Sequence, residues 1–532
     1  MIANGWHVGA ARFVITAALL FTNFEETTAS TIHRNPHPDG HRPLERAAQW
    51  FRQSQTAWGP PKTETDMNCT SFGEDCKQQW EETQIAVHPA YRQQQLDPSH
   101  EYALQLCLRF GTQIGRWRQT LVEDLDNMIQ ELEDDTNNWF QQTPTHVQKT
   151  YRQWQTIDPG FNTLQVPTII KLLETIDFGD TDTFSEELTH GFQMIGNLTP
   201  GTGWKQRSDL HYNNPSSETD FAAHNKQYIR ECLTTRKSDE HTDGLLQEIL
   251  QEVQMGRIDG PFRKPNDWTT ETVQVNNLPL LEPDEVTYTA MAFPILQTGS
   301  DGKDKVRRGE DWRRSGHNST VHVIDQPHHH NIDCFVSAGR RVMELDNKER
   351  HSSHGQADGP STTSRAHMPP LLWGHDHEGA YRQLPLRKPN EAYLLLMCKK
   401  GPTLWRHNAL LFGAVASVWG YNRFGDSIIA IMRALFGVPA MHYVDDFGAS
   451  EFQWSADSGF HTFREVNRLL GLRTKRSKEQ EPATSHKIQG TIISFHTTHA
   501  TVAPTEDRVF KINNIIQKSL HNNTLSPEKA GE

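Results

Sequence analysis

Two adjacent carboxylates, Asp445 and Asp446, constrain this chain of 532 residues more than any other feature. Apolar residues flank the pair on both sides, which predicts that both acids lie at a tight turn beside buried strands. Two neighbouring negative charges repel each other there unless a cation or a basic group neutralises them. A further acid, Asp376, follows the apolar run 371–373 and is predicted at the end of another strand. Carboxylates from neighbouring strand ends can jointly hold hard divalent cations, so the pattern predicts a metal site suited to phosphoryl transfer.

The sequence around these acids predicts an α+β domain. Four segments have the composition of strands, namely 371–376, 392–398, 441–444 and 488–494. Residues 414–436 are mostly apolar and predict a buried helix, and a second helix is expected from about 457 with Gly471 as its end. Strands with two helices on one face are typical of an α+β sheet domain.

The residues around the acids resemble two motifs of a known family. Tyr443-Val444-Asp445-Asp446 resembles the YxDD signature of reverse transcriptases. The segment 376–385, which contains Ala-Tyr-Arg-Gln, resembles the first catalytic motif of that family, D-x-x-x-A-Y-R-Q-x-P. The order and separation of the two motifs make coincidence remote, and the resemblance covers about residues 248–500. The segment 256–262 is similar to the G-R-x-x-G-P-F entry of reverse transcriptases from tyrosine-recombinase (DIRS-like) retrotransposons.

The resemblance implies a fold of the right-hand polymerase type, with an antiparallel palm sheet backed by helices, a fingers region, a mainly helical N-terminal region and no complete thumb. The expected units are an acidic, partly disordered N-terminal region of unknown role at 1–240, fingers at 245–343, an exposed polar insertion at 344–369, a palm at 370–500 and a truncated connector toward a missing thumb at 501–532.

The resemblance also implies functions for individual side chains. Asp376, Asp445 and Asp446 would be catalytic and would coordinate two Mg²⁺ or Mn²⁺ ions. Binding of the dNTP would fall to Lys305, Arg307, Tyr381 and Lys478, with the tyrosine ring excluding a ribose 2′-hydroxyl. Template and primer would be positioned by Phe412, Gly413, Ser417, Tyr443 and Gly490.

The chain departs from the family pattern at several positions. Leu411 stands where Pro is usual before Phe-Gly, and Val418 with Trp419 replaces the usual Ala-Pro. Gly309 replaces a β-branched residue of the fingers, which we expect to weaken that strand. No sequence resembling a thumb or a ribonuclease H is visible.

Two functions therefore remain open. The first is an RNA-directed DNA polymerase of a retroelement, which transfers nucleotides from dNTPs to a primer 3′-hydroxyl on an RNA or DNA template. The second is a truncated, catalytically inactive remnant that at most binds nucleic acid. A viral RNA polymerase is disfavoured because those enzymes usually carry an Asp where Tyr381 stands.

The charge distribution indicates where nucleic acid would bind. Net charge is −13, but residues 1–300 carry 23 Lys and Arg against 41 Asp and Glu, whereas residues 370–500 carry 15 against 11. A template-primer is therefore expected at the C-terminal part, with the acidic half as a separate unit. Expected partners are RNA or DNA template-primer, dNTPs and other retroelement-encoded chains that supply thumb, ribonuclease H and recombinase.

Several features bear on location and on other sites. The apolar stretch 13–21 is about half the length that a membrane span needs, so no membrane partner is expected. Six scattered cysteines favour a reducing compartment, hence cytoplasm or nucleus rather than secretion. The histidines at 328–330, with His322, are expected in a solvated loop rather than at a metal, because three adjacent residues cannot all face one ion.

Overall fold

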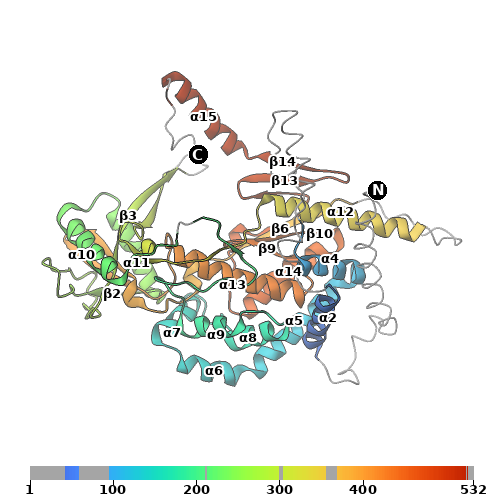
Figure 1. The fold of residues 1–532 in the computed structure, drawn as a ribbon, viewed down its shortest axis with the longest axis horizontal. Helices are drawn as coiled ribbons and strands as arrows, with labels where there is room; N and C mark the ends of the chain where they lie inside the picture. The colour runs from blue at the N-terminus through green and yellow to red at the C-terminus, as the bar shows by residue number, and fades with distance from the viewer. Residues whose placement is uncertain are drawn as a thin grey trace.

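The two strands that hold the aspartates pair directly with each other. In the computed structural model, which describes residues 42–58, 95–209, 212–298, 304–354, 368–522 and 524, the chain is a mixed α+β protein (Figure 1). Strands β6 (Leu371–Asp376) and β10 (Asp446–Glu451) run antiparallel, and β9 (Met441–Tyr443) forms a hairpin with β10. With β11 (Gln480–Ala483) they form a four-stranded sheet of order β11-β6-β10-β9, which we call the aspartate sheet.

Helices cover both faces of the aspartate sheet. On one face lie α13 (Val415–Ala434) and α14 (Gln453–Leu469), where Phe447 of the sheet contacts Phe463 of α14 with ring centroids 5.2 Å apart. The helix α12 (Ile332–His354) packs against β10 from the other face. The alternation of side chains along a strand explains this layering, since successive residues point to opposite faces. The strands expected at 371–376 and 441–444 and the helix at 414–436 are thereby confirmed, and α14 begins four residues before the predicted start.

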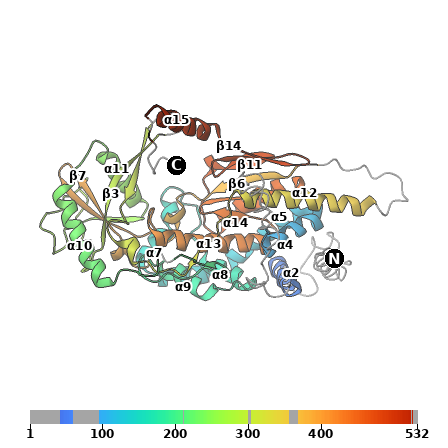
Figure 2. The same ribbon diagram turned by 45° about the horizontal axis from the view of Figure 1, so that its top comes forward.

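A second sheet of five strands lies at the other end of the molecule (Figures 1 and 2). Its order is β2-β8-β7-β3-β4, with β2 (Ile258–Phe262), β3 (Thr289–Thr298), β4 (Asp304–Glu310), β7 (Tyr393–Cys398) and β8 (Gly401–His407). Only β3 and β7 run parallel; the other neighbours are antiparallel. The helices α10 (Glu218–Thr235) and α11 (Thr242–Gln254) pack against it. The strand expected at 392–398 is present, but it pairs within this sheet and not with the aspartate sheet.

The N-terminal helices share one hydrophobic core with the helices below the aspartate sheet, which corrects the expectation of a separate acidic unit. They are α2 (Pro43–Trp58), α4 (Pro98–Phe110), α5 (Ile114–Glu131), α6 (Glu133–Gln142), α7 (Thr145–Tyr151), α8 (Val166–Thr175) and α9 (Thr181–His190). Their acidic residues lie mostly outward, while the apolar stripe of α5 packs along α14. The acidic net charge of this region does not reveal that its helices are amphipathic. Their apolar faces are buried against the C-terminal half of the chain.

One buried ion pair fixes this packing. Arg118 of α5 and Glu451 at the end of β10 are both fully buried, and their side chains lie 2.9 Å apart. Arg118 also donates to the carbonyls of Phe436, Gly437 and Ser455, so its guanidinium joins α5 to the segments after α13 and at the start of α14. The pair has enough partners to satisfy both charges in a fully buried site.

The segment after α14 forms a small third sheet. Its strands are β12 (Ser485–Ile488), β13 (Thr491–Phe495) and β14 (Ala500–Pro504), followed by α15 (Glu506–Asn522). The strand predicted at 488–494 is present as β13 from Thr491, but its predicted start is wrong: Ile488 ends β12, and Gln489 and Gly490 both have positive φ and turn the chain into a hairpin. The expected connector at 501–532 contains β14 and a helix of which no residue is buried.

Two further expectations are corrected. The polar insertion expected at 344–369 starts as a continuation of α12, in which Leu345 and Asp346 are buried; residues 355–367 lie outside the described residues. His330 does not lie in a solvated loop. It is buried against β9, where its backbone and imidazole both contact the carbonyl of His442 and its Nε2 faces Arg433 at 3.1 Å.

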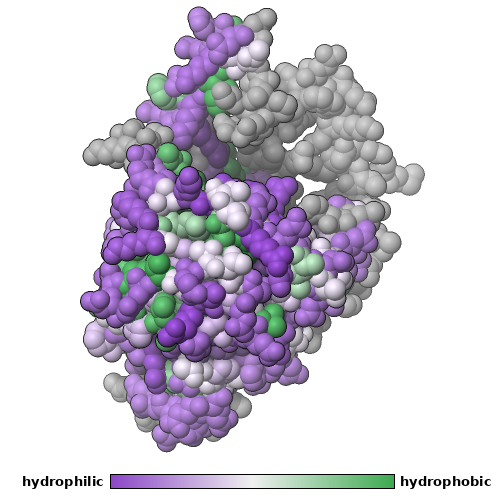
Figure 3. Space-filling model, turned by 90° about the vertical axis from the view of Figure 1, so that its left-hand side faces the viewer, coloured by the Kyte–Doolittle hydropathy of each residue, from purple (hydrophilic) through white to green (hydrophobic). Residues whose placement is uncertain are grey.

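The five-stranded sheet lies on one side of the molecule. That side is mainly hydrophilic, with small separate hydrophobic patches (Figure 3). Across the part of the chain that the structure describes, no helix is both long and apolar enough to span a bilayer. The apolar stretch 13–21 lies outside the described residues.

We predict that Arg118→Ala lowers the free energy of unfolding by about 3–5 kcal/mol, because it leaves the Glu451 carboxylate buried without its partner. The matched control is Arg468→Ala, which breaks an exposed pair with Glu465 and is expected to cost less than about 1 kcal/mol. Urea denaturation followed by far-UV circular dichroism measures both. Equal losses would contradict the buried ion pair as the anchor of the N-terminal helices.

Candidate functional site

The turn between β9 and β10 carries Asp445 in a strained backbone. Tyr443 pairs with Asp446, so Val444 and Asp445 form a two-residue turn. Val444 has a φ of 56°, a conformation that glycine usually fills in such turns and that a β-branched residue rarely adopts. His442, buried below the turn, contacts the Val444 carbonyl through Nδ1 at 3.1 Å and so helps to hold this conformation. Strain of this kind is concentrated at functional sites.

Asp376 and Asp446 point to the same face of the aspartate sheet. They are directly opposite in the register of β6 and β10, which places their Cβ atoms about 4.5–5.5 Å apart. On the same face, Gly374 and Gly448 follow along the two strands; a Cβ at Gly448 would stand 2.6 Å from the Trp373 carbonyl oxygen, so no side chain fits there. A pocket of about 450 Å³ lies between the aspartate sheet and the β12–β13 hairpin, and its lining includes Asp376, Asp446, Lys478, Lys487, Gln489 and Gly490.

The three carboxylates are electrostatically coupled. Partial burial, followed by the charge of Asp376, raises the pKa of Asp445. Partial burial and the charges of Asp445 and Asp376 raise the pKa of Asp446 to about 6. The side chain of Asp446 is nevertheless exposed to solvent, so water screens part of this repulsion. The site therefore carries more negative charge than its own surroundings compensate.

Lys478 supplies the nearest positive charge. Its ammonium, from the short helix η8 (Arg476–Lys478), bonds to Oδ2 of Asp376. Partial burial alone would lower the pKa of Lys478, but the bond to Asp376 and the charges of the other two acids raise it. The backbone of Lys475 also donates to the Asp376 carbonyl at 2.8 Å, so η8 is attached to the end of β6 by two kinds of bond.

The donor set fits a hard divalent cation by its chemistry: besides burial, the charge of Asp376 raises the pKa of Asp445, and the charges of both raise the pKa of Asp446, a repulsion that a bound cation relieves. Their present arrangement is different. Within the described ranges, no group of three or more His, Cys, Asp or Glu side chains is arranged to hold a metal ion. The ammonium of Lys478 is the cation that Asp376 contacts here.

Tyr381 lies beside the carboxylates on a short helix, η6 (Ala380–Gln383). Its ring meets the ring of Phe412 edge-on, with centroids 5.1 Å apart, and that of Tyr421 with centroids 5.4 Å apart. Burial and the charge of Asp445 raise the pKa of Tyr381 to about 12, which keeps its hydroxyl protonated at neutral pH. The predicted selector and the predicted template residue Phe412 are thus brought together.

The loop with Phe412 and Gly413 is held from two sides. The hydroxyl of Ser417 accepts from the backbone N–H of Leu411 at 2.9 Å, so Ser417 holds the loop that carries Phe412. Asn318 donates to the Gly413 carbonyl at 3.1 Å and accepts from the Val415 N–H at 3.0 Å. Gly413 has a φ of 84°, and Phe412 is 48% exposed at the tip.

Lys305 and Arg307 are exposed on β4, in the five-stranded sheet. Among the described residues, no hydrogen bond or ion pair joins either of them to the aspartates. Gly309, expected to weaken this strand, instead receives the side chains of Phe293 and Ile295, whose atoms would stand 2.7 Å from a Cβ there. A β-branched residue at 309 would displace both, so the glycine suits the β3–β4 pairing.

A buried ion network behind β4 was missed by the sequence reasoning. Glu310 is buried and faces Arg308 at 3.0 Å, Arg382 at 3.2 Å and His407 at 3.4 Å. Against the effect of burial, the interactions with His407, Arg308 and Arg382 hold the pKa of Glu310 well below its usual range. Glu252 of α11 contacts Arg308 and Arg382 as well. The signal available in the sequence is Arg382, which stands two residues before the apolar run 384–386, because an arginine that is buried needs an acidic partner.

The remaining predicted positions lie around the turn and the hairpin. Tyr443 is 37% exposed and its ring stands 4.9 Å from that of His329. Gly490 closes the β12–β13 hairpin at the rim of the pocket with a φ of 75°. Its neighbour Gln489 donates to the His330 carbonyl at 2.9 Å, which ties the hairpin to the segment before α12.

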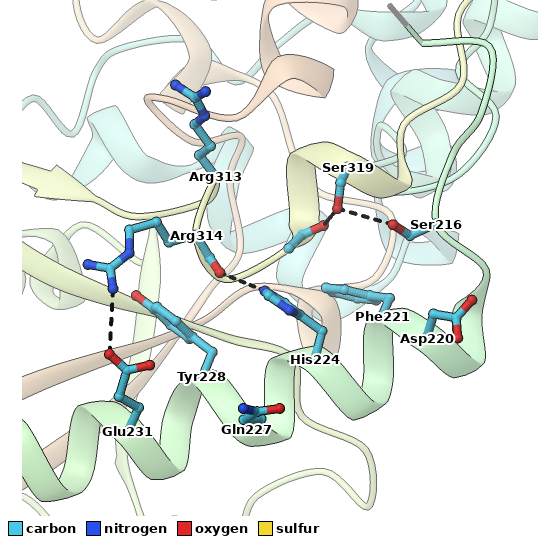
Figure 4. Close-up of a pocket in the computed structure, with 11 residues that line it drawn as sticks. Ser216, Asp220, Phe221, His224, Gln227, Tyr228, Glu231, Arg313, Arg314 and Ser319 are labelled. Carbon is cyan, nitrogen blue, oxygen red and sulfur yellow. Dashed lines mark hydrogen bonds and ion pairs between the residues drawn. The ribbon is translucent and has the colours of Figure 1, made fainter.

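A wider depression of about 630 Å³ lies between α10 and the loop 313–319 (Figure 4). His224 donates to the Arg314 carbonyl at 2.8 Å, and the Arg314 guanidinium stands 3.6 Å from Glu231. Ser216 and Ser319 face each other across the far end at 3.4 Å. These polar groups contact one another, and the depression mixes both signs of charge, so it indicates no class of ligand.

No protein-family model matches the chain, and no curated protein matches it either. The functional interpretation therefore depends on the residues themselves and on their geometry.

We predict that Asp446→Asn stabilises the protein at neutral pH. The folded state raises the pKa of Asp446 to about 6, so it binds the proton more tightly than the unfolded chain does, and stability falls as the pH rises from about 4 through about 6. The variant should lack that fall and, after allowance for screening by water, gain about 1 kcal/mol at pH 7.5.

Urea midpoints of wild type and variant between pH 4 and pH 8 measure this difference. The control is Asp457→Asn, a change at a side chain that is 85% exposed. A difference in urea midpoint between Asp446→Asn and wild type that stays constant with pH would contradict repulsion among the three carboxylates.

Proposed function

We propose that this chain is an RNA-directed DNA polymerase of a retroelement, which adds deoxynucleotides to a primer 3′-hydroxyl on an RNA or DNA template. The observation that carries the proposal is the register of Asp376 opposite Asp446, with Asp445 in the strained turn beside them. The same residues carry the resemblance to the D-x-x-x-A-Y-R-Q-x-P and YxDD motifs. In this proposal the aspartate sheet with α13 and α14 is the palm, and the five-stranded sheet belongs to the fingers.

In this proposal, bound cations neutralise the negative charges that the three carboxylates bring together. Asp376, Asp445 and Asp446 would hold two Mg²⁺ or Mn²⁺ ions, and when bound these ions lower the pKa of the primer hydroxyl and offset the charge of the triphosphate. Lys478 would release Asp376 and turn its ammonium toward the phosphate of the incoming nucleotide. Its side chain is 53% exposed, so this movement is sterically free.

The nucleotide would be bound between the two sheets by residues of both. Lys305 and Arg307 present exposed positive charges from β4, and a guanidinium can bind phosphate with two parallel hydrogen bonds. Tyr381 would place its ring below the sugar and exclude a 2′-hydroxyl. Phe412, Gly413, Tyr443 and Gly490 would contact template or primer, whereas Ser417 would act only by holding the loop.

One observation favours the alternative of an inactive remnant. The ammonium of Lys478 forms an ion pair with Asp376. Within the described residues, the three acids are not arranged as a group of metal ligands. A chain that keeps the fold and has lost turnover would show this arrangement permanently. An active enzyme would show it only without its substrate.

We predict that the purified chain extends a DNA primer on a poly-rA template with Mg²⁺ or Mn²⁺, and that Asp445→Asn and Asp446→Asn each lower the rate by at least about 100-fold, because each removes a carboxylate from the metal site. Denaturing gels with labelled primer measure product. Asp457→Asn serves as the control, since it removes an exposed carboxylate from the neighbouring helix α14.

Absence of product from folded wild-type protein would favour the inactive remnant. Product that persists in both aspartate variants would mean that the activity belongs to a contaminant or to other residues. Binding of template-primer without extension would support the remnant that keeps its nucleic-acid surface.

We also predict that Lys305→Ala combined with Arg307→Ala raises the KM for dNTP by about tenfold and leaves kcat within about threefold, because the change removes charge that attracts the triphosphate before chemistry. Steady-state extension with varied dNTP measures both constants. Arg263→Ala, at an exposed arginine paired with Glu282 after β2, is the control for a loss of positive charge on the same sheet. An unchanged KM would exclude the two residues from nucleotide binding.

A further inference from the structure

His377, the residue after Asp376, is the centre of a buried hydrogen-bond chain. It is 1% exposed, its Nδ1 lies 2.8 Å from the hydroxyl of Tyr421 on α13, and its Nε2 lies 2.9 Å from Oδ1 of Asn467 on α14. Tyr421 and Asn467 are both fully buried. The three side chains therefore connect β6 to the two helices below the aspartate sheet at fixed positions.

The direction of each bond in the chain is determined by its partners. Asn467 donates through Nδ2 to the Phe463 carbonyl at 2.7 Å, which leaves its Oδ1 facing His377 as an acceptor. His377 must then carry its proton on Nε2, and its Nδ1 must accept. The Tyr421 hydroxyl is consequently a donor, and rotation of the Tyr421 ring away from His377 would leave a buried acceptor without its bond.

The upper end of this chain meets Tyr381. The Tyr421 and Tyr381 rings stand 5.4 Å apart at an angle of 84°, an edge-to-face contact. The other ring against Tyr381 is that of Phe412, which is half-exposed at the tip of its loop. Of these two rings against Tyr381, that of Tyr421 is therefore the fixed one. The position of the Tyr381 ring beside the carboxylates depends on it.

The backbone of the same histidine is also bonded to the turn that carries Asp445. Its backbone N–H donates to the Asp445 carbonyl at 3.0 Å, and its carbonyl accepts from the Ala380 N–H at 3.1 Å. Ala380, with a φ of 31°, begins the helix that carries Tyr381. His377 thus touches both the turn of the catalytic acids and the start of the selector helix.

We propose that Asn467, His377 and Tyr421 form a positioning chain that sets Tyr381 as a selector for the sugar, so that discrimination between deoxyribonucleotides and ribonucleotides depends on the Tyr421 hydroxyl and the His377 imidazole. The inference rests on the proposed polymerase function. None of the three residues is a catalytic residue here, because each acts through Tyr381 and not by contact with the nucleotide. The chain therefore affects which sugar is accepted more than how fast the accepted one reacts.

The test compares kcat/KM for dATP and ATP in primer extension. Tyr421→Phe keeps the ring and removes the hydroxyl, and we expect it to lower the preference for dATP over ATP by about tenfold, while kcat/KM for dATP stays within about threefold. Tyr381→Ala gives the upper limit of the loss. In Tyr381→Ala combined with Tyr421→Phe we expect no further loss, because Tyr421 acts only through the ring that is already gone.

A matched control separates positioning from loss of stability. Tyr151→Phe removes an equally buried hydroxyl that donates to the Leu188 carbonyl at 2.7 Å among the N-terminal helices. It should lower the melting temperature by a similar amount and leave the sugar preference unchanged. A loss of preference in Tyr151→Phe equal to that in Tyr421→Phe would overturn the proposal.

A second pair of variants tests His377 itself. In His377→Asn the amide oxygen stands near the position of Nδ1 and can accept from Tyr421, so the preference should be largely kept; in His377→Leu it should fall as in Tyr421→Phe. Equal preference in Asn and Leu variants, or an unchanged preference in Tyr421→Phe, would overturn the positioning chain while polymerase activity stands. Wild-type protein that extends no primer would overturn the polymerase function and this inference with it.

Discussion

The register between β6 and β10 is the constraint on which the rest of the site depends. A shift of one residue would move Asp376 or Asp446 to the opposite face of the sheet, where Phe447 and His375 pack against α14. The apolar residues on that face therefore fix where the acids point. Hydrophobic burial holds together charges that would otherwise separate, and partial burial together with that repulsion raises the pKa of Asp446.

The scaffold below the sheet needs to be rigid for the same reason. The buried pair of Arg118 and Glu451 ties the end of β10 to an N-terminal helix, so the half of the chain without a recognised motif is part of the support of the site. Separating the two side chains is costly because each charge would then be buried without its partner. This cost keeps the geometry of the pair well defined. The long separation of the two residues in sequence, 333 positions, means that the complete core forms only when both halves are present.

The parts predicted from sequence are those set by local pattern. The strands at 371–376 and 441–444 and the helix at 414–436 follow from runs of apolar residues whose period is visible within a few positions. Pairing between distant segments is not visible in this way. The strand at 392–398, predicted within the palm region, pairs in the five-stranded sheet, and the hairpin at Gln489 and Gly490 is hard to predict because isoleucines stand on both sides of it. His330 was misplaced because a run of histidines carries no period.

The structure brings together the acids that the sequence places at strand ends, and their functional role stays a prediction. The hydroxyl of Ser417, predicted to position the template, accepts a hydrogen bond within its own loop. His377 is a residue whose importance the sequence alone does not reveal. Nothing in Asp-His-Glu-Gly singles out the histidine, since its partners Tyr421 and Asn467 lie 44 and 90 positions away. Once the fold joins them, three side chains that satisfy one another in a buried space leave Tyr381 little freedom on that side, and that is the property a sugar selector requires.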